Sequence, residues 1–155
     1  MSKIQIGRVA PDFKLTATGG EELSLKDLRG SHVILYFYPK DNTSGCTKES
    51  CDFMTHHLKF RRRNTIVLGI SRDSITSHER FKEKFSFPFD LLSDPDEIAC
   101  KVFDVIKEKN MYGRKVMGIE RSTFLIDENG KLRHEWRKVK VKGHVEDVLD
   151  TVKVL

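Results

Sequence analysis

Short apolar segments alternate with amphipathic ones along the chain. His32 to Tyr38 (HVILYFY) and Thr65 to Ser71 (TIVLGIS) are runs rich in β-branched and aromatic residues. Their length and composition predict two buried strands. Phe89 to Leu92 predicts a shorter strand, which stops at Ser93-Asp94-Pro95.

Helices are expected between these runs. The segment from about Cys46 to Arg63 has helical spacing of Cys51, Met54, His57, Leu58 and Arg61. Ser77 to Phe85 predicts a helix that begins near Thr76 or Ser77.

Two further helices are expected later in the chain. Asp94 or Pro95 is predicted to open one that continues through Val102, with acidic residues in its first turn. His144 to Val152 predicts an amphipathic helix whose inward residues are Val145, Val148, Leu149 and Val152.

Two hairpins complete the pattern. Ser122 to Asp127 and Lys131 to Val139 flank a turn that contains Asn129-Gly130, a strong hairpin signal. Phe13 to Leu15 and Glu22 to Leu25 flank Gly19-Gly20 and predict an N-terminal hairpin. The expected order is β-β-β-α-β-α-β-α-β-β-α, which indicates an α/β protein with a mixed central sheet. No linker or repeat is visible, so we expect residues 1–155 to form a single domain.

Composition narrows the class of protein. The 155 residues are 38% apolar and 33% charged, as in a globular domain. The sequence contains no run of 18 apolar residues, so we expect no membrane-spanning helix. Lys3, Gln5, Arg8 and Asp12 interrupt the N-terminal stretch, so we expect no signal peptide and a cytoplasmic protein.

The net charge of +5 raises the question of nucleic-acid binding. Basic residues are interleaved with acids, as in Lys82-Glu83-Lys84, and Arg61-Arg62-Arg63 is explained as a charged helix end. The alternating lysines from Lys138 to Lys142 are expected to face solvent on a strand. We therefore expect no nucleic-acid partner, although a basic binding module stays an alternative.

Cys46 lies at the predicted start of a helix. The first N–H groups of a helix lack intrahelical partners and the helix dipole is positive there, so a thiolate is stabilised. A free cysteine is usually a small buried side chain, but the polar neighbours Thr43, Ser44 and Thr47 argue against simple apolar burial. We therefore expect Cys46 to be reactive.

Cys51 follows five residues later. In an intact helix the two Cα atoms are about 7.5 Å apart along the axis and roughly 140° apart around it, which a disulfide cannot span. The pair can bond only if the turn between them unwinds. A thiolate oxidised by peroxide gives a sulfenic acid, which a nearby thiol converts to a disulfide that an outside thiol reduces. This chemistry requires no metal or organic cofactor.

Other candidate residues have simpler explanations. Cys100 follows Ile98 and Ala99 and is expected to be core packing. Zinc binding by Cys46, Cys51, His56 and His57 is disfavoured, because adjacent histidines on a helix point about 100° apart. The remaining histidines are expected on polar faces: His32, His78, His134 and His144.

The segment from Pro39 to Thr47 (PKDNTSGCT) resembles the peroxiredoxin signature, and Cys51 matches the bacterioferritin comigratory protein, or peroxiredoxin Q, subgroup. The resemblance extends over nearly the whole chain, through Gly7-x-x-Ala10-Pro11-Asp12-Phe13, Ser71-Arg72-Asp73-Ser74, Leu91-Leu92-Ser93-Asp94, Met117-Gly118-Ile119-Glu120-Arg121 and Lys140-x-Lys142-Gly143-His144. One departure is Ser44, where the family usually has proline, so the loop before Cys46 is expected to be less rigid.

This resemblance implies a thioredoxin-like fold with an added N-terminal β-hairpin. It implies a thiol peroxidase in which Cys46 reduces hydrogen peroxide and organic hydroperoxides, Cys51 resolves the sulfenic acid, and thioredoxin or a related dithiol reduces the disulfide. It also implies a monomer.

The resemblance implies four supporting residues as well. Thr43 would offer its hydroxyl, Arg121 would stabilise the thiolate, Pro39 would shield the sulfur, and Glu49 would support the hydrogen bonds. Without the resemblance, Arg121 would be assigned to a surface ion pair with Glu120, and Thr43 to a turn or N-cap. A binding module with inert cysteines and a general disulfide oxidoreductase remain alternative functions.

Overall fold

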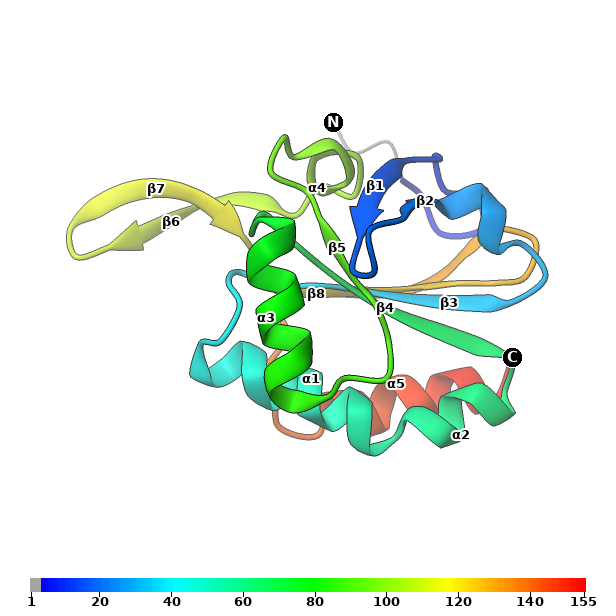
Figure 1. The fold of residues 1–155 in the computed structure, drawn as a ribbon. Coiled ribbons are helices and arrows are strands. Elements are labelled where there is room, and N and C mark those ends of the chain that lie inside the picture. Colours follow the sequence, from blue (N-terminus) through cyan, green and yellow to red (C-terminus); the bar gives the residue numbers. More distant parts are fainter. Residues whose placement is uncertain (1–3) are drawn as a thin grey trace.

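A seven-stranded mixed sheet forms the centre of the protein in a computed structural model that describes residues 4–155 (Figure 1). Its order is β2-β1-β5-β4-β3-β8-β9, with β4 parallel to both β3 and β5 and the other pairs antiparallel. The strands are β1 (Lys14–Ala17), β2 (Glu22–Ser24), β3 (His32–Phe37), β4 (Thr65–Ser71), β5 (Leu91–Ser93), β8 (Ser122–Ile126) and β9 (Leu132–Trp136). The mixed sheet and the N-terminal hairpin are confirmed, and β1 joins the hairpin to β5. The N-terminal stretch that was expected not to be a signal peptide begins with residues 1–3, which lie outside the described residues.

Helices cover the sheet on both faces (Figure 1). They are η1 (Leu25–Leu28), α1 (Ser44–Thr55), α2 (His57–Arg62), α3 (Ile75–Phe85), α4 (Ile98–Val102) and α5 (His144–Lys153). Side chains of β3 alternate between two cores: Val33, Leu35 and Phe37 pack with α4, whereas Ile34 and Tyr36 pack with α1, α2, α3 and α5. Burial on both faces explains why this strand is an unbroken apolar run. Within residues 4–155, no helix has both the length and the apolar character that a membrane crossing needs.

The segment predicted as one helix from Cys46 to Arg63 is divided at His56 into α1 and α2. Its buried face also differs from the predicted stripe, because Leu58 is 62% exposed. The buried residues of the two helices are Cys46, Glu49, Ser50, Phe53 and Phe60. Phe53 stacks on Tyr36 of β3 with ring centroids 4.6 Å apart, and this contact fixes the rotation of α1 about its axis.

Two helix starts differ from the sequence prediction. α3 begins at Ile75, because the hydroxyl of Ser74 caps it by accepting a hydrogen bond from the Ser77 amide. The helix expected from Asp94 or Pro95 begins only at Ile98. Glu97 has left-handed backbone angles, and the Asp94 carboxylate accepts hydrogen bonds from the amides of Ile98 and Cys100 instead. Asp94, four residues before Ile98, therefore satisfies two of the free amides at the start of the helix.

A second, two-stranded sheet is present that the sequence pattern does not predict. β6 (Ile106–Met111) and β7 (Arg114–Ile119) form a hairpin that projects from the body of the protein (Figure 1). Tyr112 and Gly113 both have positive φ, as a two-residue hairpin turn requires. The hairpin is mostly exposed and rich in lysine, so it lacks the apolar alternation by which half-buried strands are identified.

The last strand is shorter than predicted. β9 ends at Trp136, not Val139, because the chain leaves the sheet and Lys138 adopts a positive φ of 48°. The lysines at 138, 140 and 142 do face solvent, but from a loop. The helix from His144 is confirmed, with the four expected residues buried.

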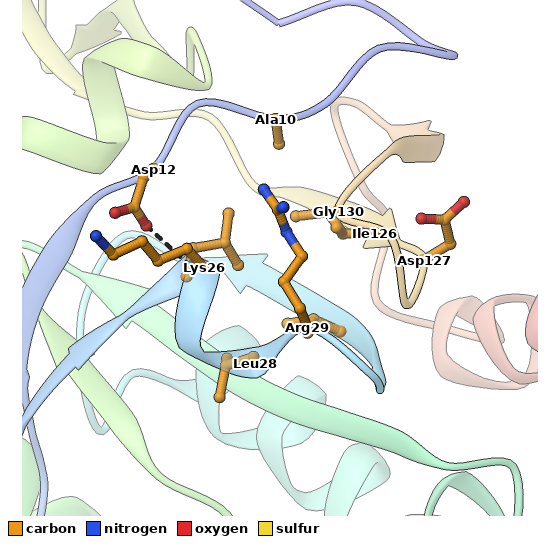
Figure 2. A pocket seen from close by; sticks show the side chains of 10 residues that line it. Ala10, Asp12, Lys26, Leu28, Arg29, Ile126, Asp127 and Gly130 are labelled. Atoms are coloured by element: carbon orange, nitrogen blue, oxygen red, sulfur yellow. Dashed lines mark hydrogen bonds between the residues drawn. The ribbon is translucent and has the colours of Figure 1, made fainter.

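A cavity of about 10 Å³ lies between η1, the N-terminal segment and the turn that joins β8 to β9 (Figure 2). The Arg29 side chain extends across it to Gly130, whose φ is 83°, and a Cβ atom at that position would overlap the guanidinium group. The positive φ favours glycine at this position, and any other side chain would also have to displace the Arg29 guanidinium group. The cavity has room for about one water and is too small for a substrate.

Candidate active site

Cys46 lies in the first turn of α1. Thr43 is the N-cap residue, and the Thr47 amide donates to the Thr43 carbonyl, so the helical hydrogen bonds begin directly after Cys46. The amides that precede Thr47 lack intrahelical partners, and together with the helix dipole they favour a negative charge at the sulfur. Contrary to the expectation from its polar neighbours, Cys46 is only 1% exposed and joins the core beside Ile34 and Tyr36.

Arg121 connects Cys46 to a buried carboxylate. One guanidinium nitrogen (Nη2) lies 3.4 Å from Cys46 Sγ, and the other (Nη1) donates to Glu49 Oε1 at 2.7 Å. A guanidinium at this distance can donate to the sulfur and stabilise negative charge that develops there. The surface pair with Glu120, to which Arg121 would be assigned without the family resemblance, is therefore wrong.

Gly45 was not predicted as a site residue, yet the absence of a side chain there leaves room for the Arg121 guanidinium. A Cβ atom at Gly45 would lie 3.1 Å from Arg121 Nη2, a contact tighter than the neighbour can accept without moving. Glycine destabilises a helix relative to alanine, so its presence in the first turn of α1 was a sequence signal that a side chain would not fit at this position.

Glu49 is fully buried, and its second oxygen, Oε2, has no hydrogen-bond partner. Burial raises the pKa of Glu49 to about 7, although the adjacent Arg121 opposes this shift. His144 Nε2 lies 3.9 Å from Oε2 and is hydrogen-bonded to the Thr123 hydroxyl at 2.8 Å. Burial lowers the pKa of His144 to about 4, so this histidine is neutral at pH 7 and forms no ion pair with Glu49. Its expected position on a polar face is wrong.

Glu49→Gln should change how stability depends on pH. An ordinary glutamate loses its proton near pH 4.5, whereas Glu49 keeps it in the folded state to about pH 7. Stability contributed by this group is therefore present at low pH and is lost as pH rises from about 4.5 through 7. Glutamine stays neutral, so the variant should gain on the order of 3 kcal/mol relative to wild type between pH 4 and pH 8. Urea unfolding of both proteins at the two pH values measures this difference, and an equal difference at both would contradict it.

The loop before α1 holds the other predicted residues. The Thr43 hydroxyl donates to the Lys40 carbonyl at 2.9 Å, which leaves its oxygen free to accept a hydrogen bond. Pro39 is half-buried and lies two residues after the end of β3, and Ser44 is the exposed first residue of α1.

All three cysteines are free thiols. Cys51 is half-buried in the same helix as Cys46, and burial raises its pKa. Cys100 is fully buried in α4, where burial and then Asp94 raise its pKa far above the ordinary value. The core position expected for Cys100 is confirmed.

The residues considered for zinc face separate partners. His56 is hydrogen-bonded to Glu146 at 3.2 Å, and Cys46 faces Arg121. Within residues 4–155, the group close enough to share an ion is a different one, formed by Asp41, Asp73 and His78.

Comparison with known proteins gives consistent matches. Residues 6–135 match the AhpC/TSA family. The chain is 50% identical to peroxiredoxin Bcp of Bacillus subtilis over 97% of this chain and 96% of that protein. It is 39% identical to peroxiredoxin Bcp of Escherichia coli over 99% and 98%.

Solved structures agree. The peroxiredoxin Q of Xanthomonas campestris superimposes with a TM-score of 0.91 at 46% identity, covering 97% of this chain and 96% of that one. A structure from a study of alkyl peroxide reduction by the bacterioferritin comigratory protein of the same organism also gives 0.91, at 45% identity and 99% and 98% coverage. These matches confirm the thioredoxin-like fold.

Proposed function

The chain belongs to the AhpC/TSA family and is a thiol peroxidase of the peroxiredoxin Bcp (peroxiredoxin Q) group, and from this premise we propose that Cys46 is its peroxidatic cysteine and Cys51 its resolving cysteine. The observation that carries the proposal is the contact between Arg121 Nη2 and Cys46 Sγ at 3.4 Å. It puts a permanent cation against the sulfur at a helix start, which is where a thiolate is most favoured.

In the first step the Cys46 thiolate attacks the terminal oxygen of a hydroperoxide. The O–O bond breaks, Cys46 becomes a sulfenic acid, and the other oxygen leaves as alkoxide or hydroxide and takes up a proton. Arg121 lies where it can stabilise this charge as it develops. Thr43 accepts a hydrogen bond from the hydroperoxide, since its own proton is committed to the Lys40 carbonyl.

In the second step the Cys51 thiol attacks the sulfenic sulfur, which releases water and forms the disulfide. Both cysteines lie within the continuous helix α1, at an axial separation of about 7.5 Å that a disulfide does not span. The first turns of α1 therefore unwind before the bond forms. Unwinding also exposes the buried Cys46 sulfur to an outside reductant.

In the third step a dithiol reduces the disulfide by thiol exchange. We assign thioredoxin or a related dithiol to this role, in a monomeric cytoplasmic protein. Hydrogen peroxide and organic hydroperoxides are the substrates, and the alkyl peroxide reduction studied in the Xanthomonas protein supports the organic class.

Disulfide mapping tests this proposal. After one equivalent of hydrogen peroxide, mass spectrometry should find Cys46 linked to Cys51 and Cys100 still reduced, because Cys100 is fully buried in another helix. Adding reduced thioredoxin should restore both thiols and be consumed in proportion to peroxide. A link from Cys46 to Cys100, or peroxide left unconsumed, would overturn the assignment.

A further inference from the structure

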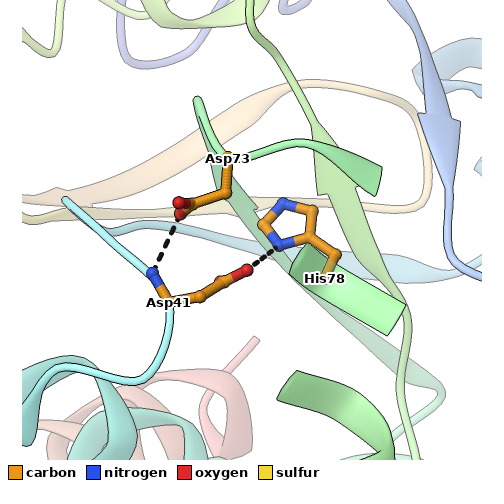
Figure 3. A group of neighbouring side chains, drawn as sticks. All are labelled: Asp41, Asp73 and His78. Carbon is orange, nitrogen blue, oxygen red and sulfur yellow. Dashed lines mark hydrogen bonds and ion pairs between the residues drawn. The ribbon is translucent and has the colours of Figure 1, made fainter. Parts of the chain in front are cut away.

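A buried polar cluster lies beneath the loop that carries the active site. Asp41 belongs to the loop between β3 and α1, Asp73 follows β4, and His78 is on α3, so three separate segments meet here (Figure 3). His78 is completely buried and Asp41 is 7% exposed. Buried charged groups are uncommon unless they are paired, so the cluster requires an explanation that core packing does not give.

The hydrogen bonds of His78 show how its protons are arranged. Nε2 lies 2.9 Å from the carbonyl oxygen of Leu92, and since a carbonyl only accepts, Nε2 carries a proton. Nδ1 lies 2.7 Å from Asp41 Oδ2. A second proton must lie between these two atoms, because two lone pairs at this distance would repel each other.

Both oxygens of Asp41 accept further hydrogen bonds. Its Oδ1 accepts a hydrogen bond from the Tyr38 hydroxyl at 2.6 Å, and its Oδ2 accepts one from the Ser77 hydroxyl at 2.8 Å. Burial raises the pKa of Tyr38 well above its ordinary value, so Tyr38 remains a donor. Asp41 is therefore held by three side chains at once, those of Tyr38, Ser77 and His78.

The cluster is not an open metal site. Both oxygens of Asp41 and both ring nitrogens of His78 are already engaged at hydrogen-bond distance. Asp73 Oδ2 accepts from the Asp41 amide at 2.9 Å and from the Ser71 hydroxyl. An ion would have to displace these bonds, so the cluster acts as a mechanical connection.

This connection ends three residues before the first turn of α1. Asp41 is held through its side chain by α3 and through its amide by Asp73. The next residue, Asn42, has a positive φ of 58° and accepts a hydrogen bond from Lys84 of α3. Thr43 and the helix that carries Cys46 follow directly, so the position of Asp41 determines where α1 begins.

We propose that His78 is a positioning residue for Cys46: its buried hydrogen bond with Asp41 clamps the loop to α3 and fixes the point at which the unwinding of α1 stops. The proposal rests on the proposed role of Cys46. With the clamp intact, the chain up to Asp41 stays in place while α1 opens, so the Cys46 thiolate returns to Arg121 after each cycle.

The test compares His78→Leu, which removes both hydrogen bonds, with His78→Asn, whose side-chain amide can still donate to Asp41. His134→Leu on β9 is the matched control, because His134 is exposed. The second-order rate constant for Cys46 oxidation by hydrogen peroxide is measured from pH 5 to pH 9, per folded molecule. We expect His78→Leu to lower it about tenfold or more, since a misplacement of about 1 Å can cost a hundredfold, and to move the half-maximal rate to higher pH. His78→Asn should recover part of the loss, and His134→Leu should match wild type.

A purely structural role for His78 predicts a different result. The melting temperature of His78→Leu would fall, but the rate constant and pH profile of the folded protein would equal those of wild type, and this would overturn the inference. If His78→Leu does not fold, Tyr38→Phe decides, because it removes one hydrogen bond to Asp41 without altering α3. A slower oxidation in Tyr38→Phe supports the clamp, and an unchanged one refutes it. Absence of peroxide oxidation in wild type would instead refute the proposed function.

Discussion

Cys46→Ser should abolish peroxide reduction altogether. A serine hydroxyl at the same position gains the same helix start and the same Arg121 contact, but it neither ionises near neutral pH nor forms a sulfenic acid. The variant should fold normally, because the substitution is nearly isosteric. Peroxide consumption coupled to thioredoxin oxidation measures the effect, and turnover above background would show that another residue is the nucleophile.

Two further cysteine variants distinguish the role of Cys46 from those of the other two cysteines. Cys51→Ser should allow one oxidation of Cys46 and then stop, since the sulfenic acid has no resolving thiol. Cys100→Ala should retain turnover, because Cys100 is buried in α4, apart from the helix that contains the other two cysteines. The three variants together separate the nucleophile, the resolving thiol and the structural cysteine.

Arg121→Gln should slow Cys46 oxidation by about 10²- to 10³-fold, the usual cost of removing one donor from a developing negative charge. The guanidinium is the cation in contact with both Cys46 Sγ and Glu49 Oε1. Glutamine keeps a polar side chain at the site but supplies no positive charge to the sulfur. The second-order rate constant of oxidation, measured against Arg133→Gln on the exposed face of β9, checks this expectation.

The same substitution should also destabilise the fold, for a separable reason. Arg121 opposes the upward shift of the Glu49 pKa, so its removal leaves an unpaired buried carboxyl group. The double variant Arg121→Gln/Glu49→Gln should recover stability at pH 8 without recovering the oxidation rate. Recovery of both would mean that Arg121 acts on Cys46 only by holding the structure together.

The sequence predicted those parts of the fold in which burial produces a recognisable pattern of apolar residues. Tyr36 and its neighbours in β3 form an apolar run because both faces of that strand are covered. The β6–β7 hairpin could not be found in this way, since its exposed, lysine-rich strands carry no burial pattern. The available signal in the sequence was the glycine at position 113, a residue typical of a hairpin turn.

Contacts between residues that are far apart in the sequence could not be predicted for a different reason. Arg121 and Glu49 are 72 positions apart, and His78 and Asp41 are 37 apart. Each side chain taken alone has a common surface explanation, which is why His78 and His144 were assigned to polar faces. Only the tertiary structure shows that a partner offsets the cost of burying them.

The interruption at His56 has a consequence for how much of the protein must loosen in each catalytic cycle. α2 has its own first hydrogen bonds, from the amides of Lys59 and Phe60 to the His56 carbonyl, and its own anchor, the fully buried Phe60. It can therefore remain ordered as one cooperative unit while the preceding helix melts as another. The boundary therefore limits the transient loss of order to α1, the helix that contains the two reacting thiols, while Phe60 holds α2 against the sheet.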